Sequence, residues 1–163
     1  MTHYNGRDRG LYDYVGAVLS GEQSLPDNQR EDFILDVLEC REPRYVEMVA
    51  GLHCSMSIDY TLLVQKALSR GLVNPTGWLL EKSVHALKRL NLLIPEGLES
   101  ALCELQKYKD DNLYSLTTVL LPNSSVSDSD GDKWKILGKY TDQSIDRSVR
   151  RSWSIKEPLP SNS

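Results

Sequence analysis

Two amphipathic segments with a sharp boundary between them occupy the middle of the chain, from Leu62 to Leu93. Apolar residues recur at helical spacing on both sides of the boundary, and Gly71 supplies the left-handed residue with which helices commonly end. Asn74 and Pro75 then begin the second segment, because proline fits the first turn of a helix. This part of the sequence predicts a helix, a short turn and a second helix.

The same spacing of apolar residues recurs in six successive segments. The expected helices run from Leu11 to a stop at Gly21, from about Asp27 to Cys40, from Pro43 to Leu52, from an N-cap at Ser57 to Gly71, from Asn74 to Arg89, and from about Pro95 to Tyr108. Short helices do not persist alone in water, so each apolar stripe must be buried against another helix. We therefore expect an all-α fold, a six-helix antiparallel bundle over residues 11–109.

The segments outside this bundle have a different composition. Residues 1–10 are expected to be a flexible N-terminus, and residues 110–121 fit either a helix, from their leucine spacing, or a strand, from Thr117-Thr118-Val119. Residues 122–132 form an acidic linker of serines and aspartates. Residues 133–163 are expected to be a polar, largely irregular and mobile tail, with one short strand at Trp134, Ile136 and Tyr140 as the alternative.

Length and composition limit the class of protein. At 163 residues the chain suits one domain with a tail, and no run approaches the roughly 18 apolar residues that a membrane-spanning helix needs. The first residues lack the apolar centre of a secretory signal, and three widely spaced cysteines fit neither a disulfide framework nor a zinc site. We expect no membrane association and a cytoplasmic location, with a nuclear one as the alternative.

No catalytic or metal-binding motif stands out in the sequence. His3, His53 and His85 lack the spacing of a metal site or a catalytic triad, and there is no glycine-rich phosphate loop. Residues 128–132, Asp-Ser-Asp-Gly-Asp, are similar to a calcium-binding loop, but aligning Gly131 with the loop glycine leaves the first and last ligand positions without a carboxylate. We expect a protein that is not an enzyme and that binds no cofactor or metal.

The net charge of −4 conceals an uneven distribution along the chain. Residues 22–59 carry nine acidic side chains against three arginines, whereas residues 60–94 carry five basic side chains against Glu81 alone. On the fifth expected helix the polar residues share an outer face, opposite Leu80, Val84 and Leu87; they are Glu81, Lys82, His85, Lys88 and Arg89. Opposite charges of this kind steer association between copies or relatives, and two ordinary solvated faces are the alternative.

One apolar residue of the second expected helix lies out of pattern. Leu35 points away from the stripe formed by Ile34, Val37 and Leu38, and we expect it to be exposed among acidic side chains. An exposed leucine on an acidic helix is suited to anchor a protein partner.

Two other functions fit parts of the sequence. The segment from Tyr60 to Leu90 would serve as a helix-turn-helix reader of nucleic acid, and Arg147, Arg150 and Arg151 add basic charge near the C-terminus. The acidic net charge makes nucleic-acid binding less favoured than protein binding. A further hypothesis is a helical inhibitor or immunity-type protein, whose acidic second helix mimics a substrate of its target.

A family resemblance rests on several short motifs. They are Leu62-Leu63, Gly71-Leu72-Val73-x-Pro75, Leu79-Leu80, Leu87-Lys88-Arg89-Leu90-Asn91-Leu92 and Leu105-Gln106-Lys107-Tyr108-Lys109. Through them residues 62–109 resemble the last three helices of death-effector domains, the six-helix death-fold modules of apoptotic adaptors, initiator caspases and their inhibitors. Before Ile58 only the number and order of helices match. The resemblance implies self-association without chemistry, through surface charge and a hydrophobic patch.

The resemblance also implies binding residues. The family's Arg-x-Asp-Leu motif falls on Arg89-Leu90-Asn91-Leu92, with Asn91 in place of the aspartate that normally pairs with the arginine. Lys88 and Arg89 would form one docking side, and the second helix would supply an acidic and hydrophobic side from Glu31, Asp32, Phe33 and Leu35. We therefore expect a non-enzymatic adaptor or inhibitor of apoptotic or innate signalling, whose partner carries a similar helical domain or is a second copy.

Overall fold

A computed structural model describes residues 9–40, 42–110, 133, 134, 136 and 141–156. These residues contain helices and no strand, so the expectation of an all-α fold is confirmed for them. The helices are α1 (Arg9–Leu19), α2 (Arg30–Cys40), α3 (Pro43–Leu52), α4 (Tyr60–Arg70), α5 (Val73–Arg89), α6 (Leu98–Gln106) and α8 (Asp142–Lys156), with single 3₁₀ turns at Asp27–Gln29 and His53–Ser55. Among them, none combines the length and apolar composition that a transmembrane span requires.

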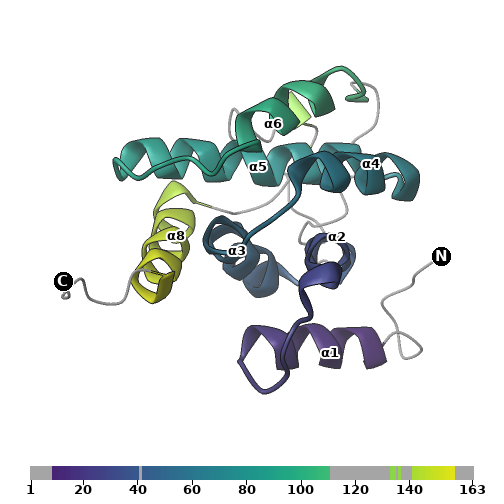
Figure 1. Ribbon diagram of the computed structural model, residues 1–163, viewed down its shortest axis with the longest axis vertical. Coiled ribbons are helices and arrows are strands. Elements are labelled where there is room, and N and C mark those ends of the chain that lie inside the picture. Colours follow the sequence, from purple (N-terminus) through teal and green to yellow (C-terminus); the bar gives the residue numbers. More distant parts are fainter. Residues whose placement is uncertain (1–8, 41, 111–132, 135, 137–140, 157–163) are drawn as a thin grey trace.

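The α5 helix is the centre of the fold. It packs against α6 and α4 on one side and against α3 and α8 on the other, while α1 lies at the far edge beneath α2 and α3 (Figure 1). Every residue of α5 from Asn74 to Val84 is buried, and so are Ala86 and Leu87. The expected apolar face at Leu80, Val84 and Leu87 is therefore in the core.

The ends of α4 and α5 follow from local sequence. Gly71 ends α4 in the left-handed conformation, at a φ of 70°, as expected. Asn91 does the same after α5, at a φ of 57°, and the Leu92 amide donates to the Leu87 carbonyl at 2.9 Å. The expected N-cap Ser57 is wrong, because the carboxylate that accepts the Leu62 amide, at 3.1 Å, belongs to Asp59.

The expectation of an irregular tail is wrong for residues 142–156, which form α8 and pack along α3. Over residues 142–153 of α8, the buried side chains are Ile145, Val149 and Ser152. The two helices approach closely, since a β-carbon at Gly51 would overlap the Ser148 carbonyl group. The expectations for residues 1–8, 111–132, 137–140 and 157–163 lie outside the described residues.

A second part of the expected tail covers α5. Trp134 is fully buried, and its Nε1 donates to Glu81 Oε1 at 2.9 Å. Its ring lies on Gly77, where a β-carbon would overlap the ring atoms. Trp134 is helical and Ile136 lies in no regular element, so the alternative of a strand is wrong at these two positions.

Candidate protein-interaction surface

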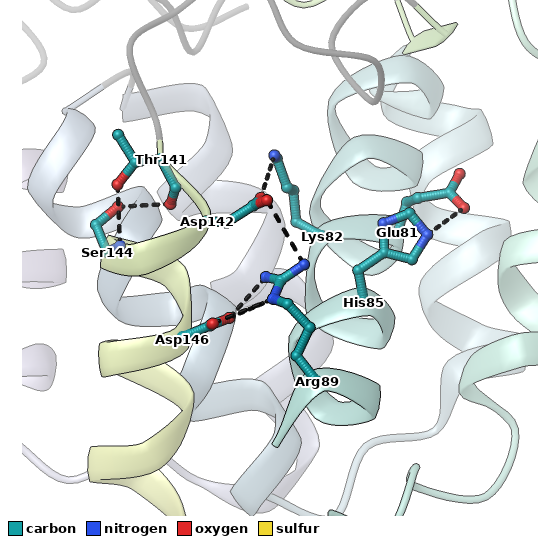
Figure 2. Close-up of polar contacts among 8 residues, drawn as sticks. All are labelled: Glu81, Lys82, His85, Arg89, Thr141, Asp142, Ser144 and Asp146. Carbon is teal, nitrogen blue, oxygen red and sulfur yellow. Dashed lines mark hydrogen bonds and ion pairs between the residues drawn. The ribbon is translucent and has the colours of Figure 1, made fainter. Parts of the chain in front are cut away.

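The C-terminal end of α5 holds the basic residues that the sequence singled out, and α8 lies against it (Figure 2). Arg89 donates from Nε to Oδ2 of Asp146 at 3.1 Å and from Nη2 to Oδ1 at 2.6 Å. A bidentate pair of this kind fixes the orientation of the guanidinium relative to the carboxylate as well as their distance. The Arg89 side chain is still 36% exposed, so this end of α5 reaches the surface.

The polar face expected on the outside of α5 is covered at two of its five residues. Lys82 is 1% exposed, and its ammonium group donates to Asp142 of α8 at 3.2 Å. Glu81 is buried beside Trp134, and its Oε1 lies 2.8 Å from Nζ of Lys133. Burial would raise the pKa of Glu81, but the hydrogen bonds from Lys133 and Trp134 outweigh it and hold that pKa below its ordinary value. The expected outer face is therefore wrong for Glu81 and Lys82.

Lys88 and Asn91 have different roles at this end of the helix. The side chain of Lys88 is 59% exposed, with its ammonium 3.5 Å from the carboxylate of Glu99 on α6. Asn91 is exposed and occupies a left-handed backbone position, which asparagine tolerates better than most residues. Asn91 thus has a local backbone role at the end of the helix.

The α2 residues expected on the opposite docking side lie inside the fold or in internal pairs. Leu35 and Phe33 are 0% and 1% exposed, so the expectation that Leu35 is exposed is wrong. The reason is that four helices contact α2, namely α1, α3, α4 and α5. Residues outside the single apolar stripe of α2 are therefore buried as well. Glu31 is also buried, and its carboxylate accepts the Asp59 amide at 2.8 Å.

The acidic charge of α2 is matched by basic residues of α4 in the same chain. Lys66 lies 3.1 Å from Asp32, and Arg70 contacts Asp36 at 2.9 Å and Glu39 as well. Burial would lower the pKa of Arg70, but hydrogen bonds to Glu39 and Asp36 outweigh it and raise that pKa. The charge split along the sequence therefore serves contacts between α2 and α4, which weakens its interpretation as two docking faces.

A polar network at His53 is sealed in the core. Nδ1 of His53 lies 2.9 Å from the Tyr60 hydroxyl, and Nε2 lies 2.8 Å from the Ser83 hydroxyl, which reaches the Ala50 carbonyl at 3.0 Å. His53 is fully buried, and this burial lowers its pKa to about 3. The network provides hydrogen-bond partners for a neutral imidazole that has no exposure to solvent.

The helix-turn-helix interpretation gains no support from the position of α5. A recognition helix needs an exposed face to enter the major groove. Between Asn74 and Val84, α5 has none, because α4, α6, α8 and Trp134 surround it.

A groove that the sequence did not reveal lies between the end of α1, α3 and α8. Its volume is about 340 Å³, and Arg44, Arg147 and Arg151 line it together with Glu47. Arg147 and Arg151 stand out in the sequence only as basic residues of a tail, and their spacing of four residues is the signal that places them on one helix face.

No protein-family model, no curated protein and no solved structure matches the chain. A functional assignment therefore depends on the geometry of the two surfaces and on the motifs of residues 62–109.

Proposed function

We propose that the chain is a non-enzymatic adaptor or inhibitor, which acts by binding the helical domain of another protein or of a second copy through the C-terminal end of α5. Lys88 and Arg89 supply the positive charge of this surface, and the partner supplies carboxylates on a helix. The resemblance of residues 62–109 to death-effector domains points to the same mode of action.

The observation that carries the proposal is the pair formed by Arg89 and Asp146. It is an example, within one chain, of this end of α5 binding aspartates on one face of a helix with defined geometry. Asp142 and Asp146 lie four residues apart and so share a face of α8, and both come close to Arg89. A partner helix with acidic residues at the same spacing would meet the exposed side of Arg89 and Lys88.

The contacts of Arg89 decide which substitution tests the proposal. Arg89→Glu would place a third carboxylate beside Asp142 and Asp146 and would loosen α8, so lost binding would have two explanations. Lys88→Glu reverses the charge of a side chain that is 59% exposed and that lies near Glu99 of α6, and it leaves the contacts of α8 intact. Lys107→Glu is a matched control, because Lys107 is 68% exposed and also lies near a glutamate of α6, Glu104.

The experiment compares the full chain with these two variants. Each is used as bait at moderate salt, captured proteins are identified by mass spectrometry, and self-association is measured by sedimentation velocity. We expect the original chain and Lys107→Glu to retain a protein with a helical domain, or to form a dimer. Lys88→Glu should lose that partner while its circular dichroism spectrum is unchanged.

Two results would contradict the proposal. In one, Lys88→Glu keeps the same partners and the same oligomeric state as Lys107→Glu. In the other, the original chain captures no helical-domain protein and is monomeric at every concentration.

A further inference from the structure

The groove between α1, α3 and α8 gathers positive charge on an otherwise acidic protein. Arg44 comes from the first turn of α3, and Arg147 and Arg151 come from successive turns of α8. All three residues are exposed. Glu47 is the acidic residue of the lining, so the groove carries a net charge of about +2 in a chain whose net charge is −4.

Within the part of the chain that the structure describes, these arginines form no ion pairs that hold the fold together. Among the described residues, no carboxylate forms an ion pair with the guanidinium of Arg44, Arg147 or Arg151. This distinguishes them from Arg70 and Arg89, which bind carboxylates of neighbouring helices. Three guanidinium groups around one groove match the planar geometry of carboxylates.

The remaining lining of the groove consists of three apolar residues and three serines of α8, which are Ser144, Ser148 and Ser152. Leu19 from the end of α1 and Met48 and Leu52 from α3 line it, and each of the three is partly exposed. A methionine side chain adapts its shape to different apolar partners. The volume of about 340 Å³ lies at the lower end of the range for ligand sites, which is enough for an apolar side chain and the backbone beside it.

We propose that this groove binds an acidic peptide segment of a partner protein, in which an apolar side chain sits between carboxylates. The apolar side chain would contact Met48 and Leu52, and the flanking carboxylates would accept hydrogen bonds from Arg44, Arg147 and Arg151. This site is separate from the C-terminal end of α5, and the two proposals are tested by different variants.

The composition of the groove favours a peptide over nucleic acid. Glu47 in the lining repels a continuous phosphate backbone, and the lining residues include no aromatic ring on which a base would stack. A peptide can place its carboxylates beside the arginines and away from Glu47. Nucleic acid and anionic lipid are therefore the competing ligands that the experiment has to separate.

The test is a fluorescence anisotropy titration of the full chain with a short labelled peptide, in which one leucine is flanked on both sides by aspartates and glutamates. The same titration is made with a peptide carrying asparagine and glutamine at the acidic positions, with a duplex oligonucleotide, and with phosphatidylserine vesicles. The chain has an acidic stretch of its own, so a variant with Asp128, Asp130 and Asp132 changed to asparagine is titrated in parallel to remove that competitor.

Four variants test the geometry. The double change Arg147→Glu with Arg151→Glu should weaken peptide binding at least about tenfold, because hydrogen bonds between charged groups are lost and repulsion replaces them. Arg150→Glu, which reverses a charge on α8 outside the groove lining, should change the affinity by less than about twofold. Glu47→Gln should tighten binding about two- to fivefold, because it removes a like charge. Met48→Gln should weaken binding by removing an apolar contact.

Several results would overturn the proposal. The acidic and neutral peptides could bind equally, or the acidic peptide could bind neither the original chain nor the asparagine variant. The duplex or the vesicles could bind more strongly than the acidic peptide. Finally, Arg150→Glu and the double change could weaken peptide binding equally. If the double change prevents folding, as judged by circular dichroism, the sign of the Glu47→Gln effect decides: unchanged or weaker binding contradicts the proposal.

Discussion

The indole ring of Trp134 lies on the backbone of Gly77, so closely that a β-carbon at position 77 would overlap ring atom Cζ3. The same indole donates to Glu81 one turn later on α5. Glycine at position 77 therefore makes room for a residue far along the chain. This contact and α8 together bury two polar residues of α5, Glu81 and Lys82.

Gly77→Ala should lower the free energy of unfolding by about 1–3 kcal/mol, because the added methyl group overfills the contact with Trp134. The measurement is a urea titration followed by tryptophan fluorescence. Gly10→Ala is the control, since a β-carbon there meets nothing within 4 Å. It should leave the stability unchanged or raise it by up to about 1 kcal/mol, as expected for alanine in a helix. Equal midpoints for the two variants would contradict the contact.

Leu35→Ala should lower the free energy of unfolding by about 2–5 kcal/mol, because Leu35 is fully buried among helices that surround α2. Leu93→Ala is the matched control at a residue that is 80% exposed, and it should change stability by less than about 0.5 kcal/mol. Chemical denaturation measures both. If Leu35→Ala were as mild as Leu93→Ala, α2 would not be enclosed by its neighbours.

Stability should also depend on pH through His53. Its pKa is about 3 in the fold because of burial, and the ordinary value is 6.5, so the unfolded chain binds the proton more readily. The neutral, buried His53 therefore contributes to the free energy of unfolding above pH 6.5, and this contribution is lost as the pH falls toward 3. Between about pH 7 and pH 5 the loss amounts to about 2 kcal/mol.

The measurement is a series of urea titrations at several pH values, made in parallel on His53→Gln. This variant keeps every other titrating group and provides the background slope. The difference between the two slopes should be about 1.4 kcal/mol per pH unit below about pH 6. Parallel slopes would show that His53 is accessible to protons in the folded protein.

The helices α1 to α6 could be predicted from the sequence because each has a recurring apolar stripe or a clear end. Gly71 and Pro43 mark boundaries that depend on backbone geometry alone. Leu35 shows the limit of this approach, since a periodic pattern identifies one buried face and cannot show that neighbouring helices cover the others. Among the α8 residues whose burial is described, 142–153, Ile145 and Val149 are the fully buried apolar residues, and they lie among serines and arginines that give little periodic signal.

The candidate sites were less predictable than the helices. The sequence singled out Lys88 and Arg89, but it could not show that Asp146, 57 residues from Arg89, approaches the same point. The groove combines residues of α1, α3 and α8, and its arginines are recognised as a group only once α8 is known to be a helix beside α3. Both surfaces are formed by segments that are distant in the sequence, and their contacts cannot be inferred from local patterns.

Both proposed surfaces require α8 to be folded against α3 and α5, and hydrogen exchange of the full chain measured by mass spectrometry tests this directly. We predict that the amides of the buried turns of α8, around Ile145 and Val149, exchange nearly as slowly as those of α3, because the two helices share a buried interface. Exchange of these α8 amides at the rate of an unstructured peptide, while α3 stays protected, would contradict both proposals.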